Sequence, residues 1–483
     1  MDDRERPRPD ARRRSLTRRS FLAATVAGLS IPGAALRGFA RAAPGAGPRL
    51  QERPTPSPSQ LEWQRDELAL FLHFGVNTFT DREWGDGTED PAIFDPARLD
   101  ARQWARVARE TGFKAMVLTA KHHDGFCLWP TETTRHSVAA SPWRGGEGDL
   151  VREFVDACRE EGLKPGLYCS PWDRNAPSYG DSPRYNELFV AQLTELLTRY
   201  GPIHEVWFDG ANGEGPNGRR QEYDWPRFWG IVRGLQPEAV IFSDAGPDVR
   251  WIGNEIGSAG ATNWSTVDPD VVPYPGATGE DVMHMLQHGD PEGTVWRPGE
   301  TDVSIRPGWF YHAAEDDEVR SVGNLVELYF TSVGRNSKLL LNVPPTPRGL
   351  LHDTDVGRLR GMHDALTALF ETDLARGARA TSRQTGRRRA VQEIDLGRTV
   401  RAGVVELRED ITRGQTVSAY TVEAAAGAPG SGDDAWRTMA AGTTIGYKRL
   451  DRFDPLPVRR LRIGLEDGRG PPPPIEARVY APG

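Results

Sequence analysis

The feature that most constrains this chain is an alternation of short apolar runs with amphipathic segments, repeated from residue 68 to about residue 371. Apolar runs of four to eight residues are typical of buried strands, and apolar residues spaced three and four apart are typical of helices. Strands that alternate with helices predict a parallel sheet. Eight such units in roughly 300 residues favour a (β/α)8 barrel, with a doubly wound open sheet as the alternative fold.

The limits of the repeating units can be read from the pattern. The apolar runs expected to supply the eight strands are, in chain order, 68–76, 114–125, 164–173, 203–210, 239–244, 261–266, 302–305 and 337–345. Helices are expected at 96–111, 149–161, 184–200, 224–235, 316–333 and 353–371. Asp95 followed by Pro96 predicts the start of the first of these helices, and Gly112 predicts its end. The runs at 261–266 and 302–305 are weaker than the others.

The pattern of apolar and polar residues changes after residue 375. Short stretches of alternating apolar and polar residues are separated there by Gly, Asp and Pro, as in an antiparallel β-sandwich. We therefore expect a barrel over 60–372 and a β-sandwich over 376–483. The expected task of the sandwich is to brace the barrel, and binding of carbohydrate is the alternative.

The amino terminus has the pattern of a targeting segment. Paired arginines, Arg18 and Arg19, precede a mildly apolar stretch and a small-residue cleavage pattern at 40–42, which predicts a twin-arginine signal peptide over 1–42. Residues 43–59 resemble a Pro-rich linker. The protein is then expected to be exported, to the periplasm or the extracellular space, and to have no membrane association once the signal is removed. The alternative is a disordered basic tail.

Composition excludes several classes of function. The net charge is -8, and becomes -14 without residues 1–42, so nucleic acid is not an expected partner. No run of about 18 apolar residues marks a membrane-spanning helix. Three cysteines, Cys127, Cys158 and Cys169, are too few for a disulfide framework and are expected to be structural thiols.

Polar and aromatic residues gather where the predicted strands end. In a barrel of this kind the reactive groups lie at the carboxyl ends of the strands. The residues found there are His73, His122, His123, Tyr168, Trp172, Trp207 and Asp209, with Trp264 and Trp309 from the weaker runs. Aromatic faces can cover the apolar side of a sugar ring, while His and Asp bond its hydroxyl groups. The pattern therefore favours a carbohydrate site.

Asp209 is the sharpest single candidate. It ends the apolar run "EVWFDG", and Gly210 behind it is expected to leave room for a ligand. A second carboxylate is needed for acid–base chemistry. Asp244, Asp248, Glu255 and Asp268 are the acids downstream. The bland interpretation is that Asp209 only caps the next loop.

Several segments resemble a known family. "FLHFGVNTF", "EWGDG", "KAMVLTAKHHDGFCLWP" and "GLYCSPWD…EVWFDGANGEG" are similar to the α-L-fucosidases of glycoside hydrolase family 29, over about residues 60–350. "GPDVRWIGNEIGSAGATNWS" and "ETDVSIRPGWFYH" resemble the branch that acts on α-1,3/1,4-linked fucose. The resemblance implies hydrolysis of terminal fucose from oligosaccharides or glycoconjugates by double displacement, without a metal or other cofactor.

The resemblance also implies roles for individual residues. Asp209 matches the family nucleophile and Glu255 matches the acid/base of this branch, with Glu214 and Asp248 as other acids for that role. The positions that match substrate-binding residues are His73, Glu83, Trp84, His122, His123, Tyr168, Trp207, Arg250 and Trp309. Glu83 and Trp84 match a loop that closes over the sugar. Arg250 is expected to bond the sugar or Glu255, or else to be a solvated loop arginine.

Other interpretations stay open at this point. His122, His123 and Asp124 could bind a metal and make a metal-dependent hydrolase, although adjacent strand residues face opposite ways unless the loop begins there. The histidines could also be satisfied core residues. The chain could bind fucosylated glycans without hydrolysing them, or hydrolyse fucosides with broad specificity.

Overall fold

The computed structural model describes residues 53–428, 430 and 435–482. The expected signal peptide over 1–42, and most of the expected linker, lie outside the described residues. The described residues form one compact unit. Among the described residues, no helix is both long enough and apolar enough to cross a membrane.

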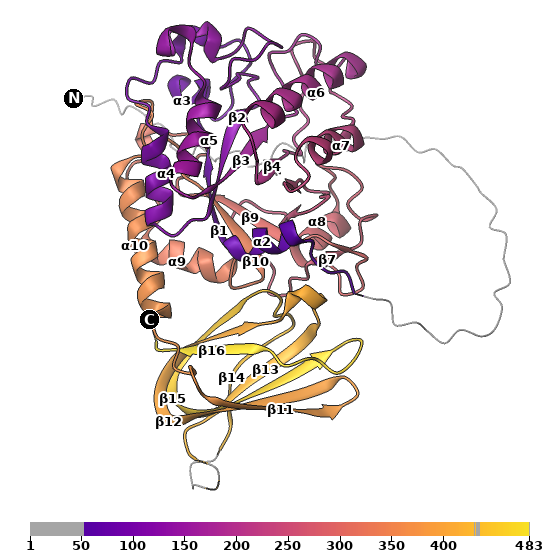
Figure 1. The fold of residues 1–483 in the computed structure, drawn as a ribbon, viewed down its shortest axis with the longest axis vertical. Coiled ribbons are helices and arrows are strands. Elements are labelled where there is room, and N and C mark those ends of the chain that lie inside the picture. The colour runs from indigo at the N-terminus through magenta and orange to yellow at the C-terminus, as the bar shows by residue number, and fades with distance from the viewer. Residues whose placement is uncertain (1–52, 429, 431–434, 483) are drawn as a thin grey trace, which may run out of the picture. The chain divides into compact units, whose positions relative to one another are not determined.

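Eight parallel strands form the sheet at the centre of the part of the chain that precedes residue 372 (Figure 1). They are β1 (Leu68–Leu72), β2 (Ala115–Lys121), β3 (Lys164–Cys169), β4 (Glu205–Trp207), β5 (Val240–Phe242), β6 (Arg250–Trp251), β9 (Gly299–Ser304) and β10 (Ser337–Asn342). Their order around the sheet is β5-β4-β3-β2-β1-β10-β9-β6. A parallel bridge between Phe242 and Val249 joins the two ends, so the sheet is a nearly closed barrel. The expected fold class is confirmed.

The strands are apolar because a parallel barrel strand is covered on both faces. Every residue of β1 and β2 is buried, which explains why their sequences are almost unbroken apolar runs. One row of side chains packs inside the barrel, where Ala69, Phe71, Val117 and Trp207 belong to the same cluster. The opposite row packs against the surrounding helices.

Helices alternate with most of the strands and lie outside them (Figure 1). They are α2 (Pro58–Asp66), α3 (Val76–Thr80), α4 (Ala101–Glu110), α5 (Leu150–Glu160), α6 (Ser182–Arg199), α7 (Trp225–Leu235), α8 (Glu280–His288), α9 (Val322–Thr331) and α10 (Asp353–Phe370). Short 3-10 turns occur at Pro91–Ile93, Val138–Ala140, Trp143–Gly146, Ala313–Glu315 and Ile411–Arg413.

The start of α4 and the position of the sixth strand differ from the sequence prediction. Helix α4 begins after Asp100, whose side chain accepts a hydrogen bond from the Gln103 amide, and not at Asp95. The sixth strand is Arg250–Trp251, and not 261–266. Part of 261–266 instead enters a two-stranded antiparallel pair, β7 (Thr266–Val267) with β8 (Val295–Trp296). A strand of two residues is too short to leave an apolar run in the sequence.

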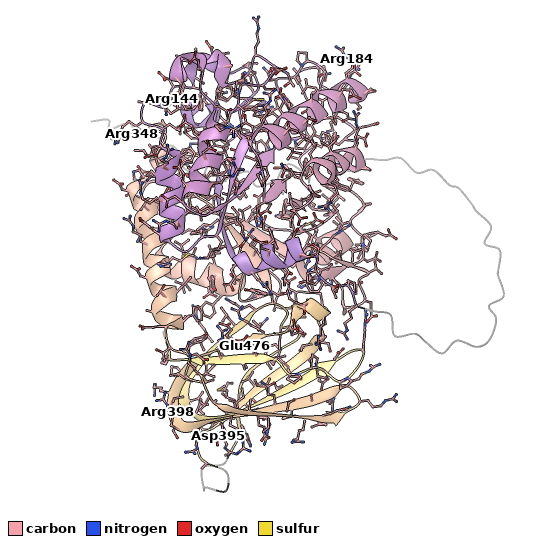
Figure 2. The ribbon with its side chains drawn as sticks, in the orientation of Figure 1. Arg144, Arg184, Arg348, Asp395, Arg398 and Glu476 are labelled. Atoms are coloured by element: carbon pink, nitrogen blue, oxygen red, sulfur yellow. The ribbon has the colours of Figure 1, made fainter. Side chains whose placement is uncertain are left out.

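The chain ends in an antiparallel sheet of six strands (Figure 1). They are β11 (Arg379–Gly386), β12 (Arg389–Arg408), β13 (Val417–Ala425), β14 (Arg437–Gly442), β15 (Arg449–Asp467) and β16 (Glu476–Tyr480). The long strands β12 and β15 carry register shifts where they pair, and the sheet encloses a separate apolar cluster. Figure 2 labels charged side chains on this sheet, Asp395, Arg398 and Glu476, and others around the barrel, Arg144, Arg184 and Arg348.

Candidate active site

The expected site residues from the first four strands lie at one end of the barrel. Strand β1 is followed by His73, β2 by His122 and His123, and β4 by Asp209, while Tyr168 lies near the end of β3. Parallel strands bring their carboxyl ends to the same rim. The rings of His73 and His122 lie 5.4 Å apart, and those of His122 and His123 lie 4.1 Å apart.

Asp209 is held in a fixed position at this rim. The residue is buried, with 3% of its surface exposed. The Tyr168 hydroxyl donates to Oδ2 at 3.1 Å, and the Ala211 amide donates to Oδ1 at 2.8 Å. Each carboxylate oxygen therefore has a donor that orients it. A carboxylate held in this way can act as a nucleophile without first losing rotational freedom.

The reason for glycine at position 210 differs from the sequence interpretation. A Cβ atom on Gly210 would lie 2.6 Å from Asp244 Oδ2 and 2.6 Å from the Gly276 amide nitrogen. Gly276 itself donates to Asp244 Oδ2 at 3.0 Å. The space beside Gly210 is therefore filled by Asp244 and the segment at Gly276, rather than left open for a ligand.

The protonation of the His123 ring follows from its partners. His123 Nδ1 lies 2.7 Å from Ser170 Oγ, and Ser170 Oγ lies 2.7 Å from the carbonyl oxygen of Trp172. A carbonyl oxygen only accepts, so the serine hydroxyl must donate to it and accept from His123 Nδ1. The Nδ1 atom therefore carries a proton. The other ring nitrogen, Nε2, lies 3.8 Å from Asp209 Oδ2.

His73 is oriented in a similar way from the neighbouring strand β10. Asn342 Nδ2 donates to the Trp309 carbonyl at 2.8 Å, which fixes the orientation of the amide. Asn342 Oδ1 then accepts from the backbone amide of His73 at 3.2 Å and from His73 Nδ1 at 2.8 Å. In a neutral ring, a proton on Nδ1 leaves Nε2 as the hydrogen-bond acceptor. His73 and His123 are therefore both suited to accept a hydrogen bond from a sugar hydroxyl group.

His122 lies beside a carboxyl group that is shielded from water. Asp124 Oδ2 is 4.0 Å from His122 Nδ1 and accepts from Asn77 Nδ2 at 3.1 Å, while the Phe126 amide donates to Oδ1 at 2.7 Å. Burial raises the pKa of Asp124 to about 7. Because β2 ends at Lys121, the two histidines lie in the loop, where adjacent side chains can share one side.

Aromatic rings surround these groups. Trp84 meets the ring of His123 edge-on at 6.1 Å and that of Trp172 at 5.9 Å. The ring of Trp309 lies 5.1 Å from that of His73. Trp207 is placed deeper, because its ring stacks on Phe242 at 4.1 Å inside the barrel and its Nε1 donates to Glu300 at 3.0 Å. Trp207 therefore supports Tyr168, whose ring lies 5.2 Å from it.

The carboxylate of Glu83 accepts hydrogen bonds from a neighbouring loop. Oε2 accepts from the Trp309 amide at 2.8 Å, and Oε1 accepts from the Phe310 amide at 3.1 Å. His312 Nε2 lies 2.8 Å from Oε1. Glu83, expected to bind the sugar, thus joins two loops of the rim in this structure.

Glu255 lies in the loop that follows β6 and is half-buried. Strand β6 adjoins β5 through the Phe242–Val249 bridge, and β5 adjoins β4, so Glu255 and Asp209 follow strands two places apart around the barrel. At the base of the loop Trp251 Nε1 donates to Asp302 Oδ1 at 2.7 Å.

The two other acids considered for the same role are placed differently. Asp248 Oδ2 accepts from Arg233 and from the Ile241 amide, at 2.6 Å and 2.8 Å, which makes it part of the β5–β6 turn. Glu214 is exposed on its loop.

The expectation for Arg250 is wrong. Its residue is 1% exposed, and its guanidinium group donates to the carbonyl of Leu286, to that of Arg297, and to Asn263 Oδ1. Arg250 pairs with Gly299, the first residue of β9, so it lies at the amino-terminal end of its barrel strand. It is neither a solvated loop residue nor a member of the rim.

Three further residues of the site carry no signal in the sequence. Ser170 and Asn342 fix the histidine rings, and His312 contacts Glu83. Each acts through a partner that is distant along the chain, so no local pattern marks them. Within the described part of the chain, no group of three or more His, Cys, Asp or Glu side chains could hold a metal ion.

A buried carboxylate among histidines that can accept hydrogen bonds from hydroxyl groups, with aromatic rings nearby, is suited to bind a sugar and to cleave its glycosidic bond. The fold and the rim thus define a glycoside hydrolase of the (β/α)8 class. Comparison with known proteins narrows this class. The family profile described as Alpha-L-fucosidase matches residues 76–368. The chain belongs to the α-L-fucosidase family of glycoside hydrolases.

Individual relatives are similar to this chain over more residues than the family profile matches. Alpha-L-fucosidase 1 of Arabidopsis thaliana is 43% identical over 446 residues, which cover 87% of this chain and 86% of the relative. A solved glycoside hydrolase 29 family member from an unknown rumen bacterium is 41% identical with a TM-score of 0.82, covering 89% of this chain and 78% of that chain. A Ruminococcus gnavus fucosidase solved in complex with fucose is 31% identical with a TM-score of 0.78, covering 90% of this chain and 96% of that chain.

Proposed function

We propose that the protein is a retaining α-L-fucosidase that removes terminal α-1,3- or α-1,4-linked L-fucose from oligosaccharides or glycoconjugates. The observation that carries the proposal is the anchored carboxylate of Asp209, oriented by Tyr168 and the Ala211 amide beside His123. The fucose bound to the Ruminococcus gnavus relative supports the choice of sugar. The linkage rests on the resemblance of the segments around Glu255 and Trp309 to one branch of the family.

The reaction would proceed in two displacements. An oxygen of Asp209 attacks the anomeric carbon, the glycosidic C–O bond breaks, and Glu255 gives its proton to the leaving oxygen. Glu255 then takes a proton from water, whose oxygen displaces Asp209 and restores the original anomeric configuration. This chemistry requires the two carboxyl groups to come within about 5 to 5.5 Å of each other around the bound sugar.

Asp209 and Glu255 variants test the mechanism. Asp209→Ala should lower turnover of an aryl fucoside by orders of magnitude, and azide should rescue Asp209→Gly as the β-fucosyl azide, because a small anion can replace the missing nucleophile. Glu255→Ala should impair aryl fucosides with good leaving groups far less than oligosaccharides, because only a poor leaving group needs the proton. Wild-type turnover by Asp209→Ala would refute the assignment.

Substrate tests separate the remaining possibilities. Hydrolysis of 3-fucosyllactose beside an aryl fucoside, with the first-formed anomer followed by NMR, reports linkage and stereochemistry together. Release of α-L-fucose from the trisaccharide is the expected result. Equal activity on α-1,2-linked fucose would indicate broad specificity, and fucose binding without turnover would indicate a glycan-binding protein.

A further inference from the structure

Two loops of the rim are tied together by the side chain of Glu83. One loop follows α3 and carries Glu83 and Trp84, and the other follows β9 and carries Trp309. The amides of Trp309 and Phe310 donate to the two oxygens of Glu83 at 2.8 and 3.1 Å. A Cβ atom on residue 308 would lie 2.4 Å from Glu83 Oε1, so only glycine permits this close approach.

His312 closes the contact between the loops. Its Nε2 lies 2.8 Å from Glu83 Oε1, and its Nδ1 lies 2.6 Å from Asp81 Oδ1. An ionised carboxylate only accepts hydrogen bonds, so both ring nitrogens must donate. The ring that satisfies both contacts is therefore the imidazolium ion. A neutral ring would turn a lone pair toward one of the two carboxylates.

The surroundings of His312 favour its charged form. The hydrogen bond to Glu83 raises the pKa of His312 to about 9, against the opposing effect of burial and with help from Asp81. Glu315 is the third carboxylate that faces the ring, and it accepts from the Gly308 amide at 3.1 Å. Arg306 is the nearby cation and interacts with Glu315.

The tied loops carry aromatic rings to both sides of the candidate site. Trp84, next to Glu83, lies edge-on to His123, whose Nε2 faces Asp209. Trp309 lies against His73, and its carbonyl accepts from Asn342. Movement of one loop relative to the other would separate these rings and open the space between His73 and His123.

We propose that His312 is a positioning residue that, with Asp81 and Glu83, holds Trp84 and Trp309 in place around the bound sugar. The proposal rests on the proposed function, because it takes the space between these rings to be the fucose subsite. His312 does not contact the reacting atoms. Its effect is on how tightly the sugar is held, and so on KM more than on kcat.

The direction of the pH dependence follows from the raised pKa. A group whose pKa is higher in the tied state stabilises that state fully below its ordinary pKa near 6.5, and the stabilisation is lost as pH rises through about 9. The loops should therefore remain tied at neutral pH and loosen in alkali. KM of the wild-type enzyme should be lowest below about pH 6.5 and rise as pH increases through about 9.

Replacement of His312 tests the proposal. His312→Gln can donate to one carboxylate only, and His312→Phe to neither. We expect KM for an aryl fucoside to rise about tenfold in His312→Gln and further in His312→Phe, with kcat within about threefold, since a charge-assisted hydrogen bond is worth about one order of magnitude or more. The alkaline rise in KM should disappear in both. His284→Gln, the same change on the exposed face of α8, should match wild type.

A second measurement does not depend on activity. NMR titration of the His312 ring should give a pKa near 9 in the wild type and a lower one in Asp81→Asn, whose side chain is 79% exposed and outside the site. A pKa near 6.5, or a wild-type KM and pH profile in His312→Phe, would overturn the proposal. Absence of fucoside turnover by the wild type would instead count against the proposed function.

Discussion

At the scale of single residues, the site works by fixing side chains whose chemistry is ordinary. A carboxylate, a phenol and histidines become specific because each has one orientation. Ser170 and Asn342 assign the Nδ1 protons of His123 and His73, and Tyr168 holds one oxygen of Asp209. Such preorganisation reduces the rearrangement needed to reach the transition state.

Tyr168→Phe tests this arrangement. The change removes the donor to Asp209 Oδ2 and keeps the ring that packs against Trp207. Because a hydrogen bond to a charged group is worth about 1.5–3 kcal/mol, kcat/KM for an aryl fucoside should fall roughly 10- to 100-fold. Steady-state kinetics would measure the change in kcat/KM, and a thermal melt would measure any change in stability.

The matched control is Tyr420→Phe. Tyr420 also donates to a carboxylate, Asp451, but in the terminal sheet. Its loss should lower thermal stability and leave kcat/KM unchanged. Equal kinetics in Tyr168→Phe and the wild type would show that Asp209 does not depend on the phenol.

The sequence is sufficient to predict the site residues that follow the ends of strands. It is insufficient to predict the residues that orient them. His73, His122, His123 and Asp209 follow apolar runs, so the barrel geometry brings them to one rim. His312 and Asn342 are recognisable only from contacts across the fold. The sequence around Arg250 has the pattern of a loop, whereas the structure makes it a buried strand.

At the scale of elements, the strands that apolar runs predict are those buried on both faces along several residues. Strands β1, β2, β3 and β10 are of this kind. Strand β6 has two residues and follows β5 without an intervening helix, so neither length nor alternation could reveal it. Closure of the barrel at β5–β6 depends on a single bridge.

The barrel interior also holds a group of charges beneath the site. Lys338 of β10 lies 3.2 Å from Glu205 of β4 and 4.0 Å from Glu300 of β9, so two carboxyl groups share one ammonium group. Burial first, and then the charge of Glu205, raise the pKa of Glu300 well above its ordinary value. Glu300 in turn accepts from the indole of Trp207.

Glu300→Gln should therefore change how stability depends on pH. An acid with a raised folded-state pKa stabilises the fold fully below its unfolded pKa, and this contribution is lost as pH rises toward the folded pKa. Glutamine cannot ionise, so the variant does not lose this stability as pH rises. Relative to wild type, the variant should gain up to about 1.4 kcal/mol per pH unit above pH 4.5 until the folded pKa is reached.

Urea unfolding at pH 5 and pH 8 would measure the difference between the two proteins at each pH. Glu318→Gln, the same substitution at an exposed position, should give a difference that is equal at both pH values. A Glu300→Gln difference that does not grow between pH 5 and pH 8 would contradict a protonated Glu300.

At the scale of the whole molecule, the terminal sheet and the barrel share a core. Val404, Leu450 and Tyr480 of the sheet belong to the apolar cluster that surrounds the barrel. Polar contacts continue the junction, since Gln415 accepts from the Ser265 amide at 2.8 Å and donates to the Asn263 carbonyl at 3.1 Å. These contacts agree with a bracing role for the sheet.

Glu67, directly before β1, is the charged centre of this junction. Its carboxylate accepts from Lys448 at 2.6 Å, from the Tyr329 hydroxyl at 2.7 Å and from the Tyr447 hydroxyl at 3.0 Å. Burial acts to raise the pKa of Glu67, but the charges of Lys448 and Arg408 outweigh it and hold that pKa below its ordinary value.

Glu67→Gln should destabilise the protein by roughly 3 kcal/mol at pH 7, because it leaves Lys448 buried without its carboxylate. A carboxylate with a lowered pKa stabilises the fold above its ordinary pKa near 4.5, and the contribution is lost as pH falls. The difference between variant and wild type should therefore shrink below pH 4.5. Urea unfolding at pH 7 and pH 4 would measure this difference in stability.

Glu327→Gln is the control variant. It breaks an exposed ion pair with Arg452 across the same junction and should lower the free energy of unfolding by less than about 1 kcal/mol. Equal costs for the two variants at pH 7 would show that burial of Glu67 adds nothing to the junction.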